Sequence, residues 1–324
     1  LQALRFKHFT RNGYALFSCL GKEVIVCTLS VTTLTNAKAK GVSTHEAVAV
    51  DSLGRQEVKL DEVIVTGSRA PLTAIQSAKI VSVITRDDID RAPAETVNDL
   101  LKLAIGADVR QRGSFGVQTD ISINGGTSDQ ITILLNGMNI SSPQTGHNAA
   151  DFPVDMADIE RIEILEGSSA RVFGSSAFNG AINIVTKHEK RTGARLSAEG
   201  GSFGTWGVNG RVSVATGAVT NSVSGGYRQS DGGTLHSDFK RRQMFYQGDL
   251  ASQHIDLQWQ VGLSSQDFGA NTFYSAKFND QFEATRRYLT SLSGTIKPFD
   301  TDWLTLVPQL YWHRDYDHYQ LIRG

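Results

Sequence analysis

The residues of this 324-residue chain that could do chemistry are suited to binding a ligand rather than to catalysis. A zinc hydrolase would need H-E-x-x-H, which the sequence lacks, and neither Gly167–Arg171 nor Gly174–Phe178 completes the G-x-S-x-G turn of a serine hydrolase. The segments 112–118 and 141–148 are instead rich in glycine and short polar side chains. Backbone and amide groups of such segments can approach a bulky polar ligand closely, so the sequence predicts a binding protein and no enzyme.

Metal ligands and charge give few further signals. His147 has no second ligand nearby in the sequence, which favours a hydrogen-bonding role over coordination. We expect no cofactor. Four acids in or beside the long loops, Asp231, Asp238, Asp267 and Asp280, have the oxygen ligands that calcium prefers, and the alternative is that these carboxylates are only solvated. The formal net charge of -1 provides no electrostatic footprint for nucleic acid, so no nucleic-acid partner is expected.

Residues 1–39 have the pattern of a secretory signal peptide. Three basic residues between positions 5 and 11 precede an apolar run at 24–34, and Ala37-Lys38-Ala39 supplies an A-x-A end. An N-terminal strand is the alternative. Both cysteines, Cys19 and Cys27, lie inside this segment, so a mature chain would have no disulfide and no cysteine nucleophile. No stretch approaches the roughly 18 consecutive apolar residues of a spanning helix, which excludes a helical membrane protein.

Beyond residue 40, two halves of different composition must position the candidate loops. Residues 40–190 contain four aromatic side chains, whereas residues 203–324 contain nineteen of the chain's 27, including all four tryptophans. We place the boundary near 187–191. The first half predicts a small α+β domain. Its helical signals are a capping box at Thr85–Asp88 and an apolar helix face through Val97, Leu100, Leu101 and Ala104. Its strands are expected at 80–84, 131–135, 161–165 and 181–185, with a hairpin turn at Asn136-Gly137.

The second half alternates strictly between apolar and polar side chains. Ile255, Leu257 and Trp259 point one way, and Asp256 and Gln258 point the other. Apolar-out, polar-in strands with short turns on one side and long loops on the other are typical of an outer-membrane barrel, while a soluble sandwich, which alternates in the same way, is the alternative. About seven segments are predicted, near 192–202, 205–217, 221–229, 241–252, 255–267, 285–297 and 303–316, with long connections at 230–240 and 268–284.

The sequence resembles the TonB-dependent receptors, a family of outer-membrane active importers. Asp61–Arg69 looks like their TonB box and its flank. Ile121–Gly126 followed by Ile133–Gly137 looks like the central signature of their plug domain, and the motifs that look like its end are Arg161–Gly167, Phe173–Gly180 and Ala181–Thr186. There are departures: Asn124 and Glu166 stand where the family often has Arg, and Ser168 stands where it often has Pro.

The resemblance implies an α+β plug domain followed by antiparallel transmembrane β-barrel strands. We expect a signal peptide at 1–39, a flexible periplasmic tail at 40–60, the TonB box region at 61–69, the plug at 70–189 and the N-terminal part of the barrel at 190–324. The family's barrel has about 22 strands, so about seven leave two open edges. The chain is therefore expected to be the N-terminal portion of a transporter in the outer membrane of a Gram-negative bacterium.

The resemblance also implies the partner that supplies energy. The sequence has no Walker loop, so work must come through another protein. The predicted contact segment is Val63, Ile64, Val65, Thr66 and Gly67. Its first four residues are β-branched, and such a segment can add as a strand to a partner's sheet edge. That partner is expected to be TonB, with its inner-membrane energising complex, and an ordinary plug strand is the alternative.

Ligand contacts are expected from the outward loops of the plug and from one barrel loop. The run Ser142–His147 and the Leu-Asn-Gly hairpin look most similar to cobalamin importers, so cobalamin is the expected cargo and a ferric siderophore the alternative. A soluble periplasmic binding module is the alternative of a different class. The predicted contact residues are Ser114, Phe115, Gln118, Gln144, His147 and Asn148 in the plug, and Asn271, Phe273 and Tyr274 in the barrel loop.

Overall fold

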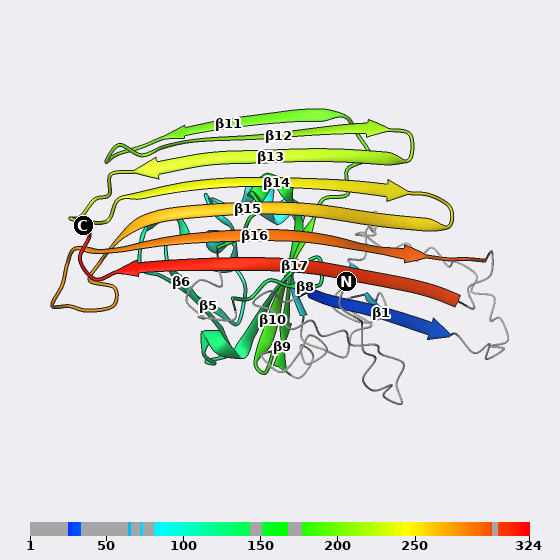
Figure 1. Cartoon of the computed structure of the whole chain (residues 1–324), viewed down its shortest axis with the longest axis horizontal. Helices are drawn as coiled ribbons and strands as arrows, with labels where there is room; N and C mark the ends of the chain where they lie inside the picture. The colour runs from blue at the N-terminus through cyan, green and yellow to red at the C-terminus, as the bar shows by residue number, and fades with distance from the viewer. Residues whose placement is uncertain are drawn as a thin grey trace, which may run out of the picture.

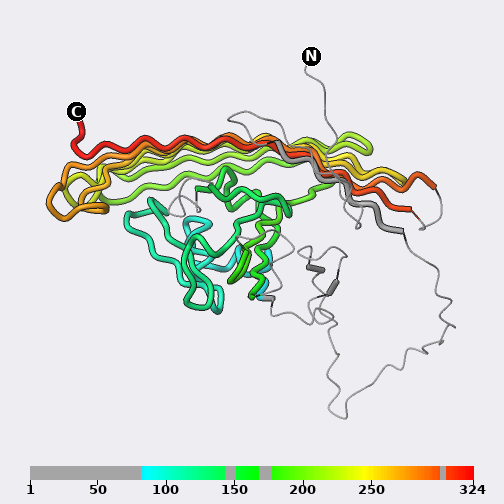
Figure 2. Tube along the Cα trace, turned by 60° about the horizontal axis from the view of Figure 1, so that its bottom comes forward, coloured from blue at the N-terminus to red at the C-terminus, as the bar shows by residue number. Residues whose placement is uncertain are grey.

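A curved antiparallel sheet and a small α+β domain make up the structure (Figure 1). The structure is a computed structural model and describes residues 25–33, 64–65, 72–73, 81–142, 151–167, 177–299 and 304–324. We call the small domain the plug (residues 81–186) and the strands from residue 193 onward the wall. Figure 2 shows the plug, in cyan to green, lying against one face of the wall.

The plug is built around a five-stranded mixed sheet. Strand β10 (Gly180–Thr186) pairs in parallel with β7 (Ile131–Leu135) and antiparallel with β9 (Ile159–Glu166). Strand β4 (Val81–Ile84) lies on the far side of β9, and β8 (Met138–Asn139) lies on the far side of β7. Every residue of β7 and β10 is buried, as expected for central strands that are covered on both faces.

The local signals in the plug sequence produce the expected turns and caps. Helices α1 (Arg86–Arg91) and α2 (Val97–Leu101) each begin at a threonine that forms a capping box with the aspartate three residues later. The turn Asn136-Gly137 has positive φ at both residues, 50° and 78°, and joins β7 to β8 as predicted. The predicted helix face is buried at Val97, Leu100, Leu101 and Ala104, although α2 itself ends at Leu101.

A separate hairpin carries the first candidate loop. It consists of β5 (Ala107–Gln111) and β6 (Thr119–Ile123), and the connection between them contains the 3-10 turn η1 (Ser114–Gly116). Two further 3-10 turns are η2 (Ser128–Gln130) and η4 (Met156–Asp158). In Figure 1 this hairpin extends toward the end of the wall that carries the long connections.

The wall has the predicted seven strands, and each is antiparallel to the next along the chain. The predicted alternation of tight and long connections is also present, with long ones at 231–238 and 272–280. The strands are β11 (Gly193–Gly200), β12 (Trp206–Thr216), β13 (Val219–Ser230), β14 (Phe239–Ala251), β15 (Ile255–Asn271), β16 (Gln281–Ile296) and β17 (Leu304–Gln320).

Four of these strands run further than predicted, toward the end of the wall with the long loops. Strand β15 ends at Asn271 rather than near 267, β16 begins at Gln281 rather than near 285, and β17 ends at Gln320 rather than near 316; β14 begins two residues early. In β14 and β15 the reason is a reversal of the pattern, because Lys240 and Asp267 face outward while Phe239 and Phe268 are buried against the plug. The backbone ladder continues through this reversal.

The wall has its polar side chains buried and its apolar side chains exposed. Gln247, Gln260 and Arg287 face the plug and are at most 2% exposed, whereas Val212 is 51% exposed. This distribution is the reverse of a soluble sheet and fits strands whose outer face meets hydrocarbon. No helix among the described residues is long and apolar enough to span a membrane.

One additional strand lies inside the segment predicted to be a signal peptide. Strand β1 (Ile25–Thr33) pairs antiparallel with β17, so the complete sheet has eight strands, with open edges at β1 and β11. The same β-branched and apolar residues suit both a strand and the apolar centre of a signal. Cleavage after Ala39, which would remove β1, stays a prediction.

Candidate ligand site between the plug and the wall

The connection between β5 and β6 forms a tight loop held by its own backbone. Gly113 N donates to Val117 O at 3.1 Å, and Val117 N donates to Ser114 O at 3.2 Å. Phe115, Gly116 and Gln118 all have positive φ, which only glycine adopts without strain. A Cβ on Gly116 would lie 2.3 Å from Asn98 Nδ2, so this glycine allows the loop to pack against α2.

Phe115 fixes this loop to the wall. Its ring lies 5.4 Å from the ring of Phe239 on β14, and the Arg228 guanidinium of β13 lies 5.0 Å from the centre of the Phe115 ring. Val117 joins Phe239 and Phe268 in a small buried apolar cluster. Phe273, from the 272–280 connection, packs on the same cluster, 6.4 Å from Phe268. Residues far apart in the sequence therefore meet in one cluster.

A chain of hydrogen bonds makes a second link. The Gln118 side-chain amide donates to the Tyr274 hydroxyl, which in turn donates to the buried carboxylate of Glu283. The Tyr274 ring also packs edge-on against Tyr319 at 4.8 Å. Burial raises the pKa of the Tyr274 hydroxyl, and the hydrogen bond to Glu283 raises it further, so this hydroxyl stays protonated and continues to donate.

A pocket of about 720 Å³ lies beside these links, between the β5–β6 hairpin and the wall loops. Its lining includes Ser114, Asn271, Phe273 and the glycines Gly113 and Gly233. Such a lining exposes backbone amides and short polar side chains together with one aromatic face, which suits a large polar ligand.

Three basic side chains line the pocket, but each is paired with an acid. Lys102 Nζ lies 2.9 Å from Asp99 Oδ1, Arg110 Nη2 lies 2.6 Å from Asp108 Oδ2, and Arg112 Nη2 lies 3.6 Å from Asp120 Oδ2. Arg112 also donates to the backbone carbonyl of Phe273. The charges of the lining are therefore largely offset by acids at short range.

The structure brings six of the predicted contact residues to this region. Ser114, Asn271 and Phe273 line the pocket. Phe115, Gln118 and Tyr274 instead make the contacts that hold the hairpin to the wall, and ligand contact by any of the six stays a prediction. The other three predicted residues, Gln144, His147 and Asn148, lie outside the described residues.

Several lining residues were not predicted. Gly233, Thr234 and Ser237 belong to the 231–238 connection, whose length was noted but whose residues were not selected. Lys102 follows α2 and carries no sequence signal for a site. Glu283, which accepts the hydrogen bond from Tyr274, could have been predicted to face the plug, because alternation along β16 places it on the same face as Gln281 and Arg287.

Polar contacts also anchor the centre of the plug to the wall. Asp158, at the end of η4, is fully buried; Ser224 Oγ donates to its carboxylate at 2.6 Å and Arg211 forms an ion pair with it. Burial raises the pKa of Asp158, and the hydrogen bond from Ser224 and the charge of Arg211 oppose that rise without cancelling it. Farther along the wall, Ser264 Oγ donates to Asp151 Oδ1 at 2.6 Å.

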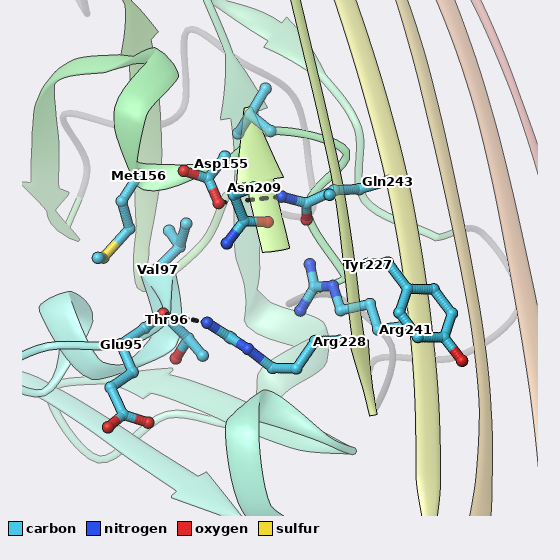
Figure 3. Close-up of a pocket in the computed structure, with 12 residues that line it drawn as sticks. Glu95, Thr96, Val97, Asp155, Met156, Asn209, Tyr227, Arg228, Arg241 and Gln243 are labelled. Atoms are coloured by element: carbon cyan, nitrogen blue, oxygen red, sulfur yellow. Dashed lines mark hydrogen bonds between the residues drawn. The ribbon is translucent and has the colours of Figure 1, made fainter. Parts of the chain in front are cut away.

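A small cavity of about 30 Å³ lies in the same interface (Figure 3). Gln243 Nε2 donates to Asp155 Oδ2 at 3.1 Å, and Arg228 Nη2 donates to the Glu95 carbonyl at 3.3 Å. Figure 3 shows the side chains of Arg228 and Gln243 extending from the wall toward the plug. This cavity is too small for a nutrient, so it belongs to the interface rather than to a ligand site.

Two departures from the family pattern contact each other. Asn124 Nδ2 donates to Glu166 Oε2 at 2.8 Å, which links the end of β6 to the end of β9. The chain therefore has its own polar pair at the positions where the family often has two arginines. The third departure, Ser168, lies outside the described residues.

Little of the expected TonB box is described. Ile64 and Val65 form β2, which pairs antiparallel with β3 (Leu72–Thr73). Val63, Thr66 and Gly67 lie outside the described residues. The extended backbone at 64–65 agrees with the predicted strand character, and the contact with TonB stays a prediction.

Three of the four acids considered for calcium, Asp238, Asp267 and Asp280, have basic neighbours. Arg323 forms two hydrogen bonds to Asp238, at 2.8 and 3.0 Å, and Arg286 Nη2 lies 2.6 Å from Asp267 Oδ1. His236 Nδ1 lies 3.1 Å from Asp280 Oδ1. Calcium binding in these loops stays a prediction.

Comparisons with known proteins agree with this architecture. Residues 73–181 match the family described as TonB-dependent Receptor Plug Domain. The chain is 32% identical over 216 residues to the vitamin B12 transporter BtuB of Photobacterium profundum, covering 64% of this chain and 33% of that protein. It is 29% identical over 250 residues to the vitamin B12 transporter BtuB of Vibrio vulnificus, covering 75% and 38%.

Solved structures share the fold at lower identity. The unliganded ferric citrate transporter FecA superposes with a TM-score of 0.64 at 17% identity, covering 78% of this chain and 42% of that one. The siderophore receptor PiuA from Acinetobacter baumannii gives 0.60 at 16% identity, covering 81% and 39%. This chain thus spans about a third of the length of the curated relatives and about two fifths of these structures. It belongs to the TonB-dependent receptors, outer-membrane proteins of Gram-negative bacteria, and it carries their plug domain and an open part of their barrel.

Proposed function

We propose that this chain is part of a receptor that binds cobalamin at the cell surface and imports it to the periplasm with energy transmitted by TonB. The observation that carries the proposal is the arrangement of plug and wall. The wall exposes an apolar face, and its polar face holds a separate domain whose outermost hairpin borders a large polar pocket.

The chemistry of the plug–wall interface supports transport rather than permanent closure. Asp158, Asp155 and Asp151 bind the wall through hydrogen bonds and ion pairs. Water can replace such contacts, and a hydrogen bond contributes only about 0.5–1.5 kcal/mol net because both states are hydrogen-bonded. A pull on the plug can therefore rearrange this interface stepwise, which an apolar interface of the same area would resist more strongly.

The β-branched segment that contains β2 supports TonB as the source of that pull. It lies ahead of the plug in the chain, and its residues are β-branched at Val63, Ile64 and Val65. Main-chain hydrogen bonds from such a segment to a partner's edge strand grip it without a deep side-chain pocket.

Two observations favour cobalamin as the cargo. Curated relatives near 30% identity are named vitamin B12 transporters. The pocket lining pairs each of its three basic side chains with an acid and offers amide and hydroxyl groups, which suits a large ligand with many amide groups and little net charge. A strongly anionic ferric siderophore would be attracted better by unpaired arginines.

The experiment is nutrient uptake by the complete receptor in cells that lack their own cobalamin receptor. We expect growth and uptake with cobalamin, and we expect deletion of 63–67 to abolish uptake while the cells still bind cobalamin at their surface. Uptake of ferric siderophores instead of cobalamin would refute the cargo, and loss of surface binding in the deletion would count against the TonB box. A receptor found in the aqueous fraction, without detergent, would favour a soluble binding module.

A paired substitution tests the pocket itself. Ser114→Trp places an indole in the pocket lining and should lower cobalamin binding more than about tenfold. Ser202→Trp is the matched control, because Ser202 is also exposed, in the β11–β12 connection, and does not line the pocket. Equal binding by the two variants would place the ligand elsewhere.

A further inference from the structure

The outward face of the wall changes from apolar to basic toward the long loops. Pairing between strands aligns Met244, Leu263 and Tyr288 in one cross-strand row, which ends at Arg314 on β17. The next row toward the loops contains Arg242, Ser265 and Arg286, and it ends at Tyr227 on β13 and Tyr316 on β17. A third row brings Lys240 beside Asp267.

Four basic side chains therefore gather on an outer surface that is apolar elsewhere. We call Lys240, Arg242, Arg286 and Arg314 the basic belt. Asp267 is the one acid in the three rows, all of which lie in described residues, and it is paired with Arg286 at 2.6 Å. Two basic residues on β14, one on β16 and one on β17 leave a clear positive excess at the height of the belt.

Aromatic rings hold two arginines of the belt, Arg242 and Arg314, against the wall. The Arg314 guanidinium lies 4.5 Å from the centre of the Tyr316 ring, and the Arg242 guanidinium lies 5.9 Å from that of Tyr227. Tyr316 in turn contacts the edge of Tyr288 at 6.1 Å. A guanidinium that lies over a ring directs its N–H donors outward in its own plane, and this planar fork matches the oxygens of a phosphate.

Between β16 and β17 these side chains border a groove on the outward face. It has a volume of about 620 Å³ and is lined by Arg286, Tyr288, Trp312, Arg314 and Tyr316, among others. The charged groups lie at its loop end, and Trp312 lies at its other end, two residues farther down β17. At about 3.3 Å per residue, that separation is about 7 Å along the strand.

The depth of this groove identifies its occupant. Below Trp312 the outward residues of the same strands are apolar, as at Leu292 and Leu310. Arginine at the centre of the apolar band would cost about 2–4 kcal/mol, but near the interface it costs about 0–1 kcal/mol, and aromatic rings mark that interface. Since the long loops face outside the cell, the belt lies at the headgroup level of the outer leaflet.

We propose that this groove binds a phosphate-bearing headgroup of an outer-leaflet lipid. Arg286 and Arg314 bind the phosphate, the rings of Tyr288 and Trp312 pack against the upper part of the acyl chains, and the rest of those chains follows the apolar face. The proposal rests on the membrane location of the wall but is independent of the cargo.

The test uses quenching of Trp312 by brominated lipids in the complete receptor. The other tryptophans, Trp206, Trp259 and Trp303, are replaced by phenylalanine, and the receptor is placed in phosphatidylcholine vesicles. Brominated phosphatidylglycerol, which has an anionic phosphate headgroup, should quench Trp312 more strongly than brominated phosphatidylcholine at equal content. That preference should weaken as salt is raised, because the contact is between charges.

Charge removal and a second tryptophan provide the controls. Arg286→Gln and Arg314→Gln should each lower the relative association constant for the anionic lipid about fivefold, and uptake of the cargo should persist. Trp259 lies outside the groove, on β15 and one outward row farther from the long loops than Trp312, and it should be quenched equally by both lipids when it is the single tryptophan. Equal quenching of Trp312 by both lipids, or a preference that neither salt nor the substitutions change, would overturn the proposal. If neither lipid quenches either tryptophan, the wall is not in the bilayer, a failure distinct from loss of the lipid site.

Discussion

Replacement of Asp158 by alanine is the sharpest test of how the plug is held. The Asp158 carboxylate is fully buried, and it accepts hydrogen bonds from the Ser224 hydroxyl at 2.6 Å and from the backbone N–H of Asp155 at 2.9 Å. It also pairs with Arg211, whose side chain is 7% exposed. Asp158→Ala leaves this guanidinium buried in the interface with Glu189, 3.5 Å away, as its acidic neighbour.

The expected magnitude follows from that orphaned charge. Breaking a buried ion pair by removing one partner costs about 3–5 kcal/mol. We expect the lower end, about 3 kcal/mol, because Glu189 still offsets part of the Arg211 charge. At about 1.4 kcal/mol for each factor of ten, the equilibrium between docked and open plug should shift roughly a hundredfold toward the open form.

Amide hydrogen exchange of the complete receptor in detergent measures this shift directly. Amides of β9 and β10 should exchange roughly a hundredfold faster in Asp158→Ala, while those of β14 and β15, whose ladder is independent of Asp158, should keep their rates. Asp87→Ala is the matched control, because Asp87 is 79% exposed and its pair with Arg91 spans 3.6 Å. Such a surface pair contributes about 0–1 kcal/mol.

A second variant separates a buried charge from a general loss of packing. The raised pKa of Asp158 indicates that desolvation outweighs its favourable contacts, so the pair itself adds little net stability. Asp158→Ala combined with Arg211→Leu should therefore recover most of the lost protection. This reasoning would be refuted if the amides of β9 and β10 exchanged equally fast in Asp87→Ala and Asp158→Ala. It would also be refuted if they exchanged faster in the double variant than in Asp158→Ala.

Three further predictions concern other parts of the molecule. Tyr274→Phe removes the hydroxyl between Gln118 and Glu283, and exchange of the 112–118 amides should reflect a loss of about 1–3 kcal/mol; unchanged exchange would contradict the link. Burial raises the pKa of Asp99, but hydrogen bonds from Lys102 and Thr96 outweigh burial and hold the pKa below its usual value. The Asp99 carboxylate therefore stabilises α2 fully at a pH above the usual pKa, and this stabilisation is lost as the pH falls through the lowered pKa. Asp99→Asn should remove this pH dependence from the amide exchange of α2. Trp259 points outward beside Tyr246, in one row with Leu292 and Leu310, and should contact lipid, so brominated lipids that left its fluorescence unchanged would reject the orientation of β15.

Local signals in the sequence were enough to predict most elements but not their ends. Alternation along 255–267 identified β15 because Leu257, Trp259 and Val261 face outward. The last four residues of that strand were missed because the pattern reverses there: Asp267 faces outward, and Phe268 is buried in an apolar cluster. Hydrophobic periodicity reports which environment each face meets, so it misplaces the end of a strand where those environments change.

The candidate site could not be predicted without the fold, although two of its three loops, 112–118 and 272–280, supplied residues selected from the sequence. Gln118 and Tyr274 are separated by 156 positions, and neither composition nor spacing indicates that they share a hydrogen bond. Gln118 comes from the β5–β6 hairpin of the plug, and Tyr274 comes from the connection between β15 and β16 of the wall. Long-range pairing of this kind has no local sequence signal.

The two kinds of plug–wall contact divide the work of binding and release. Near the loops, the hairpin is held by the apolar cluster of Val117, Phe239 and Phe268, which resists water and keeps the pocket in shape. Toward the centre, Asp158 and Asp151 hold the plug through polar contacts that water can replace, and Phe245 and Leu289 of the wall also pack in the apolar core of the plug. Under the proposed function, a pull on the plug would exchange the polar contacts for water one at a time, whereas each apolar cluster would have to be opened as a unit. The cluster beside the pocket would then keep the pocket in shape until the plug has begun to move, which would couple release of the cargo to that movement.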